Sequence, residues 1–256
     1  MSNADSDAPS RSAYEAHTPW TPAPALLVAL VASLSPILIG IASVLAENHG
    51  LIPHVTATPA GQPPSLSSPS LLVQMIAGQM LSLVIIWVAA GWRGGRAQTL
   101  RLAAPQTDWL TAIGYGLLLV AVLGPIEVLL YRVAGIGLFT DGRWLLEGLH
   151  SPLWWAVVLA AVVLAPLWEE VTFRGFLLSA LAKSALGFWP AALLSSAIWT
   201  LLHWGYSWPG LASVFLAGLG LSWIMKRTGS LRAAVISHSV INACSLSVIY
   251  LFAPAT

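Results

Sequence analysis

The sequence predicts an all-α integral membrane protein, a polytopic transmembrane bundle of about seven or eight membrane helices. Hydrophobic residues make up 57% of the 256 residues and charged residues only 8%, and the mean hydropathy is +0.79. A soluble domain carries about 25% charged residues. A surface built from so few charges must mostly face lipid, so membrane lipids are the first expected partners.

The spans follow from the apolar stretches. A helix that crosses the hydrocarbon layer needs about 20 mostly apolar residues. Pro166 lies inside the fourth stretch and could kink it or divide it into two helices, which would give an eighth membrane segment. The seven candidate spans are Leu26–Ala46, Leu71–Trp92, Leu110–Arg132, Leu153–Leu181, Trp189–Trp204, Pro209–Met225 and Leu231–Phe252.

The remaining segments are polar or short. Residues 1–25 are polar and rich in proline, and we expect a disordered cytoplasmic tail. Asn48–Ser70, rich in Pro, Ser and Thr, is predicted to be a loop, and Phe139–His150 a short interfacial helix. Residues 26–150 form a first group of transmembrane helices to which no motif assigns a role.

Charge distribution predicts the orientation, because cytoplasmic loops carry an excess of Lys and Arg. With the N-terminus inside, eight basic residues fall in cytoplasmic segments and two, Arg132 and Arg143, outside. We therefore expect a cytoplasmic N-terminus. The lack of eukaryotic retention or lipidation signals favours a bacterial plasma membrane.

Several function classes lose support. No basic run provides a surface for nucleic acid. The single cysteine, Cys244, cannot form an internal disulfide. No internal repeat indicates a transporter built from inverted halves.

The fourth span contains charges that are costly in a membrane and therefore indicate a function. Glu170 and Arg174 are four residues apart and lie on one helix face, so they can pair. Glu169 points about 100° away and has no partner at that spacing. This carboxylate is the one that remains for chemistry.

Two further stretches add polar side chains. His203 ends the fifth stretch, while His238 and Asn242 are four residues apart in the seventh. Three helices can therefore contribute to one pocket, although an intramembrane His or Asn equally often forms a hydrogen bond between helices. Glu127, in the third span, is left open as a proton carrier, a partner of a neighbouring helix or a member of the pocket.

The depths of the two histidines differ. At 1.5 Å per residue, His238 lies about 10 Å from the inner end of its span, and His203 about 21 Å from its own. A shared pocket requires the fifth helix to start later or to tilt.

Three short motifs occur in this part of the chain. Residues 169–174 read EEVTFR, Trp199 precedes His203 by four residues, and residues 238–242 read HSVIN. They resemble, in order, the EExxxR, FxxxH and HxxxN motifs of the CPBP family, the CAAX-protease and bacteriocin-processing (Abi) intramembrane proteases. Trp199 replaces the phenylalanine of the second motif. Residues 228–234, TGSLRAA, are similar to the usual approach to the third, and the resemblance covers about residues 153–247.

This resemblance implies an intramembrane endopeptidase whose catalytic transmembrane core is residues 151–256. The substrate would be a membrane-associated protein or peptide, processed as CAAX proteins or bacteriocins are. It implies that Glu169, helped by His203, activates water, and that His238 and Asn242 stabilise the oxyanion.

The resemblance leaves alternatives open. Glu170 and Arg174 would hold the fourth helix in register. Glu169, His203 and His238 could instead bind Zn²⁺, although no HExxH motif is present; we favour the metal-free mechanism. A non-proteolytic scaffold or immunity protein of the same fold is the main rival function. A proton-coupled transporter using Glu127, Glu169 and the histidines is a weaker one.

Overall fold

The computed structural model describes residues 14–51, 69–92, 94–102 and 107–254, and the regular structure in these ranges is entirely helical. The predicted all-α fold is confirmed. Residues 1–13 of the predicted tail, residues 52–68 of the predicted loop and the basic residues Arg11 and Arg93 lie outside the described ranges.

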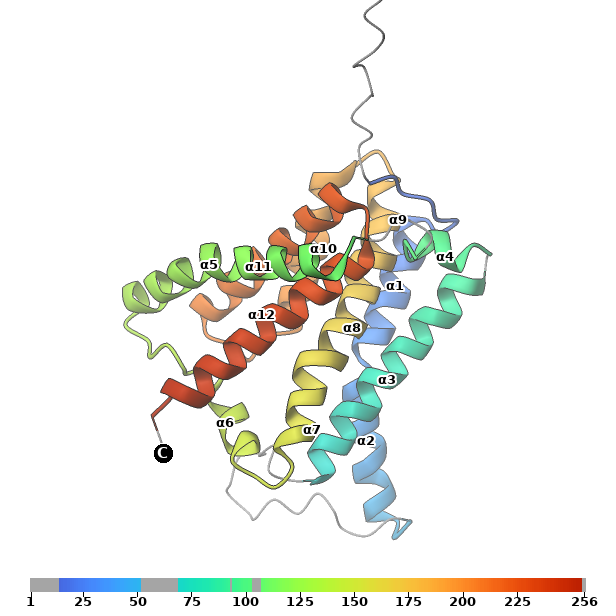
Figure 1. Cartoon of the computed structure of the whole chain (residues 1–256). Coiled ribbons are helices and arrows are strands. Elements are labelled where there is room, and N and C mark those ends of the chain that lie inside the picture. Colours follow the sequence, from blue (N-terminus) through green and yellow to red (C-terminus); the bar gives the residue numbers. More distant parts are fainter. Residues whose placement is uncertain (1–13, 52–68, 93, 103–106, 255–256) are drawn as a thin grey trace, which may run out of the picture.

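Figure 1 shows the helices in chain order. Two segments, η1 and η2, are π-helical. The elements are α1 (Pro22–Ser33), α2 (Ser35–Asn48), α3 (Pro69–Trp92), α4 (Arg96–Thr99), α5 (Trp109–Ala134), α6 (Arg143–Leu149), α7 (Trp154–Val158), η1 (Leu159–Leu164), α8 (Ala165–Glu170), η2 (Val171–Leu177), α9 (Leu178–Ala182), α10 (Phe188–Leu201), α11 (Trp208–Thr228) and α12 (Leu231–Phe252).

The chain is an integral membrane protein. Within the described residues, five helices are long and apolar enough to cross a membrane: α3, α5, the continuous helix from α7 to α9, α11 and α12. The bent pair α1 and α2 would add a sixth. The predicted count of seven or eight is therefore not confirmed.

The first predicted span is bent by 42° between α1 and α2. Pro36 lies in the first turn of α2, where its missing N–H and its ring interrupt the helical hydrogen bonds. Gly78 of α3 packs directly on this proline, because a Cβ at Gly78 would lie 2.5 Å from the Pro36 Cα. The bend and the close approach of α3 therefore occur at the same point.

The fifth predicted span, Trp189–Trp204, is wrong in length. The helix α10 has 14 residues and ends at Leu201, so it is about 21 Å long, short of the hydrocarbon thickness. A turn follows, and Ser207, in an extended conformation, precedes a new helix with Pro209 in its first turn. Proline is favoured at a helix start and cannot continue a preceding helix.

The fourth predicted span is one continuous helix, Trp154–Ala182, and is not divided at Pro166. Its two π-helical segments widen the turns on either side of α8. Side chains of other helices donate to backbone carbonyls in these segments: Asn242 to Ala161 and Ser195 to Phe173. π-Helical turns often occur at functional sites, and here they flank the Glu169–Glu170 pair.

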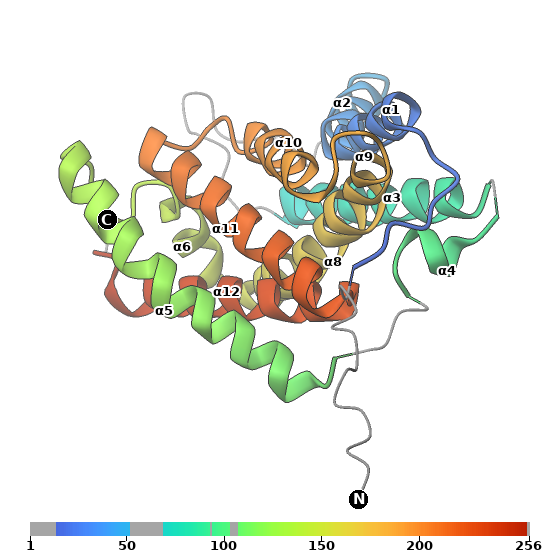
Figure 2. The ribbon, with the colours of Figure 1, turned by 90° about the horizontal axis from the view of Figure 1, so that it is seen from above.

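The N-terminal helices pack on two different parts of the bundle. α1 and α3 contact η2 on one side, and α5 packs along α12 on the other. Figure 2 shows this arrangement from above, with α8 between the two groups. The described helices between residues 26 and 150 therefore pack with the later helices as parts of one bundle.

Part of the predicted tail is ordered. The Tyr14 side chain is buried, and its hydroxyl lies 3.2 Å from the Ser179 Oγ of α9. The Lys183 Nζ donates to the Thr18 carbonyl at 2.6 Å, and the Trp20 indole donates to the α3 backbone. Residues 14–21 are thus a docked arm, and the expected disorder does not apply to them.

Candidate active site

The turn between α11 and α12 positions His238. Gly229 ends α11 in the left-handed conformation, with φ of 65°, which glycine adopts without steric cost. The Ser230 Oγ then accepts a hydrogen bond from the Ala233 N–H and caps α12. His238 follows about two turns later and is buried. The TGS sequence thus sets where this helix begins.

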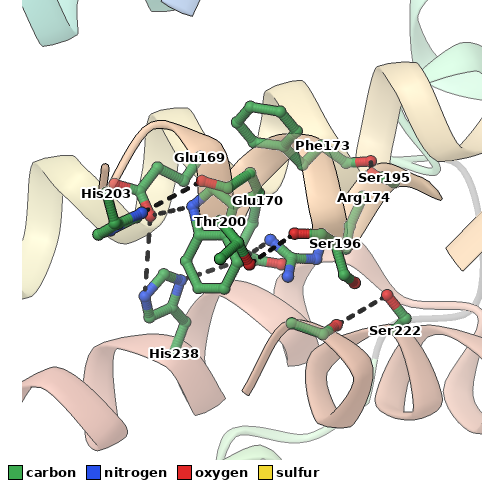
Figure 3. Close-up of polar contacts among 12 residues, drawn as sticks. Glu169, Glu170, Phe173, Arg174, Ser195, Ser196, Thr200, His203, Ser222 and His238 are labelled. Atoms are coloured by element: carbon green, nitrogen blue, oxygen red, sulfur yellow. Dashed lines mark hydrogen bonds and ion pairs between the residues drawn. The ribbon is translucent and has the colours of Figure 1, made fainter. Parts of the chain in front are cut away.

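Glu170 joins two helices. Its side chain is fully buried, and its Oε1 accepts from the Arg174 Nη1 at 3.0 Å and lies 2.9 Å from the His238 Nδ1 (Figure 3). The predicted Glu170–Arg174 pair is present. An ionised carboxylate only accepts hydrogen bonds, so the His238 Nδ1 carries a proton in this arrangement and the Nε2 is directed elsewhere.

Glu169 has two neighbours, and both come from other helices. Its Oε2 accepts from the Trp199 Nε1 at 2.8 Å. The His238 Nε2 lies 3.9 Å from the same oxygen. Spacing along one helix could not reveal either contact, because both partners come from elements distant in sequence.

Trp199 is at the centre of the group and was not predicted to have a role. Its ring lies 4.4 Å from the Arg174 guanidinium carbon and meets the rings of His203 and His238 edge to face, at 5.3 Å and 5.5 Å. The sequence shows only an aromatic residue in the place of another. The direction of the indole N–H becomes visible only in the fold.

His203 lies beyond the end of α10, in the turn that follows, and not within a span. Its Nδ1 is 3.1 Å from the Trp199 carbonyl oxygen, and its ring packs on Tyr206. No hydrogen bond or ion pair between His203 and Glu169 is found in the described part of the chain. The residue of α10 that reaches Glu169 is Trp199, one turn earlier, which agrees with the difference in depth between the two histidines.

Asn242 binds the backbone of the long helix. Its Nδ2 donates to the Ala161 carbonyl at 2.8 Å. This carbonyl belongs to η1, where the wider helical turn changes the backbone pairing. Asn242 therefore fastens α12 to η1, one turn beyond His238.

A second polar group lies beside the site, around Asp141. Its carboxylate accepts from the backbone N–H and the hydroxyl of Ser207 at 2.8 Å and 2.6 Å, and from the Tyr131 hydroxyl. These bonds tie the α5–α6 connection to the start of α11. Glu127, left open by the sequence, interacts electrostatically with Asp141.

Tyr206 packs on His203 and senses the charges of both groups. Burial is the main cause that raises its pKa to about 12, and the negative charge of Glu169 is the second. Asp141 also contributes, so the phenol lies within reach of both carboxylates. Tyr206 therefore keeps its proton over the whole physiological range and can act there as a hydrogen-bond donor. No periodicity marked it in the sequence.

The residues do not fit the proposed zinc site. Among the described residues, no group of three or more His, Cys, Asp or Glu side chains is arranged to hold a metal ion. His203 is the expected ligand that is missing from the pair formed by Glu169 and His238. A structural or catalytic zinc needs at least three protein ligands.

A comparison with family models finds one match in this part of the chain. Residues 150–244 match the family described as type II CAAX prenyl endopeptidase Rce1-like. The resemblance to the CAAX proteases is confirmed. The matched segment contains all three motifs and every residue of the group around Glu169. Since the family is one of proteases, the match supports a peptidase.

A curated relative also aligns. The chain is 28% identical over 80 residues to UPF0177 protein YxdF of Lactococcus lactis subsp. lactis (strain IL1403), an alignment that covers 31% of this chain and 42% of that protein. The chain thus spans less than half the length of this relative. No solved structure matches the chain.

Proposed function

We propose that the protein is an intramembrane endopeptidase in which Glu169 activates a water molecule for attack on a peptide bond. The proposal rests on one observation: the Glu169 Oε2 and the His238 Nε2, from two different helices, face each other at 3.9 Å. That distance is longer than a hydrogen bond. A water molecule can therefore bridge the two groups, accepting from the His238 Nε2 and donating to the Glu169 carboxylate.

The surroundings support the assignment of roles. Glu170 holds the His238 Nδ1 at 2.9 Å, which turns the Nε2 toward Glu169. Glu170 is itself held by Arg174 at 3.0 Å. Each reacting group thus has a fixed neighbour, as catalytic groups require.

The reaction can be written with these groups alone. The Glu169 carboxylate takes a proton from water as the water oxygen bonds to the carbonyl carbon. The carbonyl oxygen becomes an oxyanion, which accepts a hydrogen bond from a protonated His238 Nε2. Glu169 then gives its proton to the amide nitrogen, the C–N bond breaks, and a carboxylic acid and an amine are released.

His203 and Asn242 are proposed in supporting roles. His203 packs against Trp199, so it can act on Glu169 through the indole or approach it directly when substrate is bound. Asn242 uses one amide hydrogen for Ala161 and has a second that can be donated to the oxyanion.

The proposed substrate is a membrane-associated protein or peptide, with a prenylated CAAX sequence as the first candidate. The orientation proposed is a cytoplasmic N-terminus in a bacterial plasma membrane. The docked arm supports it, because basic residues gather at that end of the bundle: Arg101 binds the Glu15 and Gly229 carbonyls, and Lys183 binds Thr18.

The test is cleavage of a farnesylated CAAX peptide and of a proteome-derived peptide library by the purified protein in detergent. Glu169→Gln keeps the size of the side chain and the acceptor for Trp199 but removes the base. We expect its kcat to fall by about 100- to 10,000-fold. Glu147→Gln, the same change at an exposed position of α6, is the control and should match the wild type.

Three outcomes would count against the proposal. Equal kcat in the wild type and Glu169→Gln would exclude Glu169 as the base. Loss of activity with a chelator, restored by Zn²⁺, would show a metalloprotease. A wild type that cleaves neither the CAAX peptide nor the library would favour a non-proteolytic scaffold of this fold.

A further inference from the structure

We propose that Trp199 is a positioning residue that holds the Glu169 carboxylate apart from His238. This role rests on the proposed peptidase function. The role depends on the indole N–H of Trp199; a phenylalanine, the residue that usually stands in this motif, has no N–H to donate.

Trp199 and His238 both approach the same oxygen of Glu169, the Oε2. The Trp199 Nε1 binds the Oε2 at 2.8 Å, within hydrogen-bond range, whereas the His238 Nε2 lies 3.9 Å from that oxygen. The terminal torsion of a glutamate is broad and soft. Without the indole, a small rotation would bring the carboxylate into direct contact with His238. Glu169 and His238 would then bind each other directly, and neither would be available for water or substrate.

The tryptophan is itself held firmly. It is only 3% exposed, and its ring lies under the Arg174 guanidinium and beside His238. Arg174 and His238 both bind Glu170. The indole that binds Glu169 therefore belongs to the same buried group of side chains that orients His238. Trp199 holds Glu169 and Glu170 holds His238, so both ends of the 3.9 Å separation are fixed.

An indole N–H suits this task chemically. It is only a donor and cannot accept a proton from Glu169. The carboxylate therefore keeps its basic function while one of its lone-pair positions is occupied. A lysine or histidine at residue 199 would compete for the proton, and a phenylalanine would leave the carboxylate without this restraint.

The experiment compares Trp199→Phe with Trp168→Phe in the purified full-length protein. Both tryptophans are buried, at 3% and 6% exposure, and both variants keep a six-membered aromatic ring. Trp168 packs on Phe173, and no hydrogen bond from its indole is found in the described structure. The pair therefore separates loss of the N–H donor from loss of ring volume.

In the peptidase assay, Trp199→Phe should lower kcat by about 10- to 100-fold, the effect of a lost hydrogen bond to a charged group. KM should change little, because the indole acts on the base and not on the substrate. Trp168→Phe should stay close to the wild type. An unchanged kcat in Trp199→Phe, a change in KM alone, or an equal loss in both variants would overturn the positioning role.

A second measurement does not depend on turnover. The ring nitrogens of ¹⁵N-labelled histidine report hydrogen bonding, and His238 can be assigned by the loss of its signals in His238→Gln. In Trp199→Phe we expect the Nε2 signal to shift as Glu169 moves onto it, with no such shift in Trp168→Phe. An unshifted Nε2 would overturn the proposal.

The two proposals can fail separately. Full activity in Glu169→Gln would overturn the proposed mechanism whatever Trp199 does. An inactive Glu169→Gln beside a Trp199→Phe variant with wild-type kcat and an unshifted spectrum would leave Glu169 as the base and overturn only the role of Trp199. If the wild type cleaves nothing, the catalytic role falls with the function, and the spectrum decides whether the indole separates the two groups.

Discussion

Replacement of Arg174 by methionine should destabilise the protein strongly. Arg174 and Glu170 are both fully buried and are joined at 3.0 Å. Removing one partner of a buried ion pair costs about 3–5 kcal/mol, and here it would leave the Glu170 carboxylate with His238 alone. Arg174→Met also removes the cation that lies on the Trp199 ring.

The size of this effect can be measured as a melting temperature in detergent. For a protein of this length, 1 kcal/mol corresponds to roughly 2–4 °C. We therefore expect a decrease of about 6–20 °C, followed by fluorescence or by aggregation on heating.

The double variant Glu170→Gln/Arg174→Met tests the reasoning. In the described structure, the Arg174 Nε and Nη2 and the Glu170 Oε2 lack a hydrogen-bond partner, so the buried charges are incompletely compensated. Removing both charges should restore at least half of the lost stability, while His238 loses its charged partner and activity stays low. A single variant as stable as the wild type, or a double variant no better than the single, would refute this account.

Three further predictions concern neighbouring positions. Gly218→Ala should cost about 1–3 kcal/mol, because its Cβ would lie 2.9 Å from the Ser196 side chain and 3.0 Å from the Arg174 Nη2; Gly114→Ala, which meets open space, should be neutral in the same melting assay. Asp141→Asn should cost about 1–3 kcal/mol, because an amide nitrogen would replace an oxygen that now accepts hydrogen bonds, and limited proteolysis should show a looser turn at residues 202–207. The pKa of Tyr206, raised to about 12, means that the unfolded chain loses this proton first; stability should therefore fall as the pH rises from about 10 toward 12, and Tyr206→Phe should reduce that fall in melting temperature.

The sequence predicted the long helices well because lipid imposes a simple rule. Five candidate spans, those matching α3, α5, the helix from α7 to α9, α11 and α12, agree with the structure to within a few residues. Composition and span length suffice there, because every lipid-facing residue must be apolar. The single-helix spacing of Glu170 and Arg174 was also sufficient to predict their pairing.

The features that were missed depend on neighbours distant in sequence. The short α10 looked like a span because its residues are apolar. Gly205 and Pro209, residue types that mark turns and helix starts, lie just beyond its end. Glu169 contacts Trp199, which lies 30 residues later in the chain, and Glu170 contacts His238, which lies 68 residues later. Periodicity describes one helix at a time and cannot predict them.

The docked arm at residues 14–21 bears on the order in which the protein is made. Tyr14 and Thr18 each bind a residue 165 positions later in the chain, Ser179 and Lys183. Ribosomes release the N-terminal end first, so the arm can meet α3 early, but these two contacts cannot form until α9 has been synthesised and inserted. A chain that stops short of α9 would lack these two contacts and leave the arm more open to cellular proteases than it is in a finished chain. Closure of the arm is thus a late step of biosynthesis that distinguishes complete copies from truncated ones.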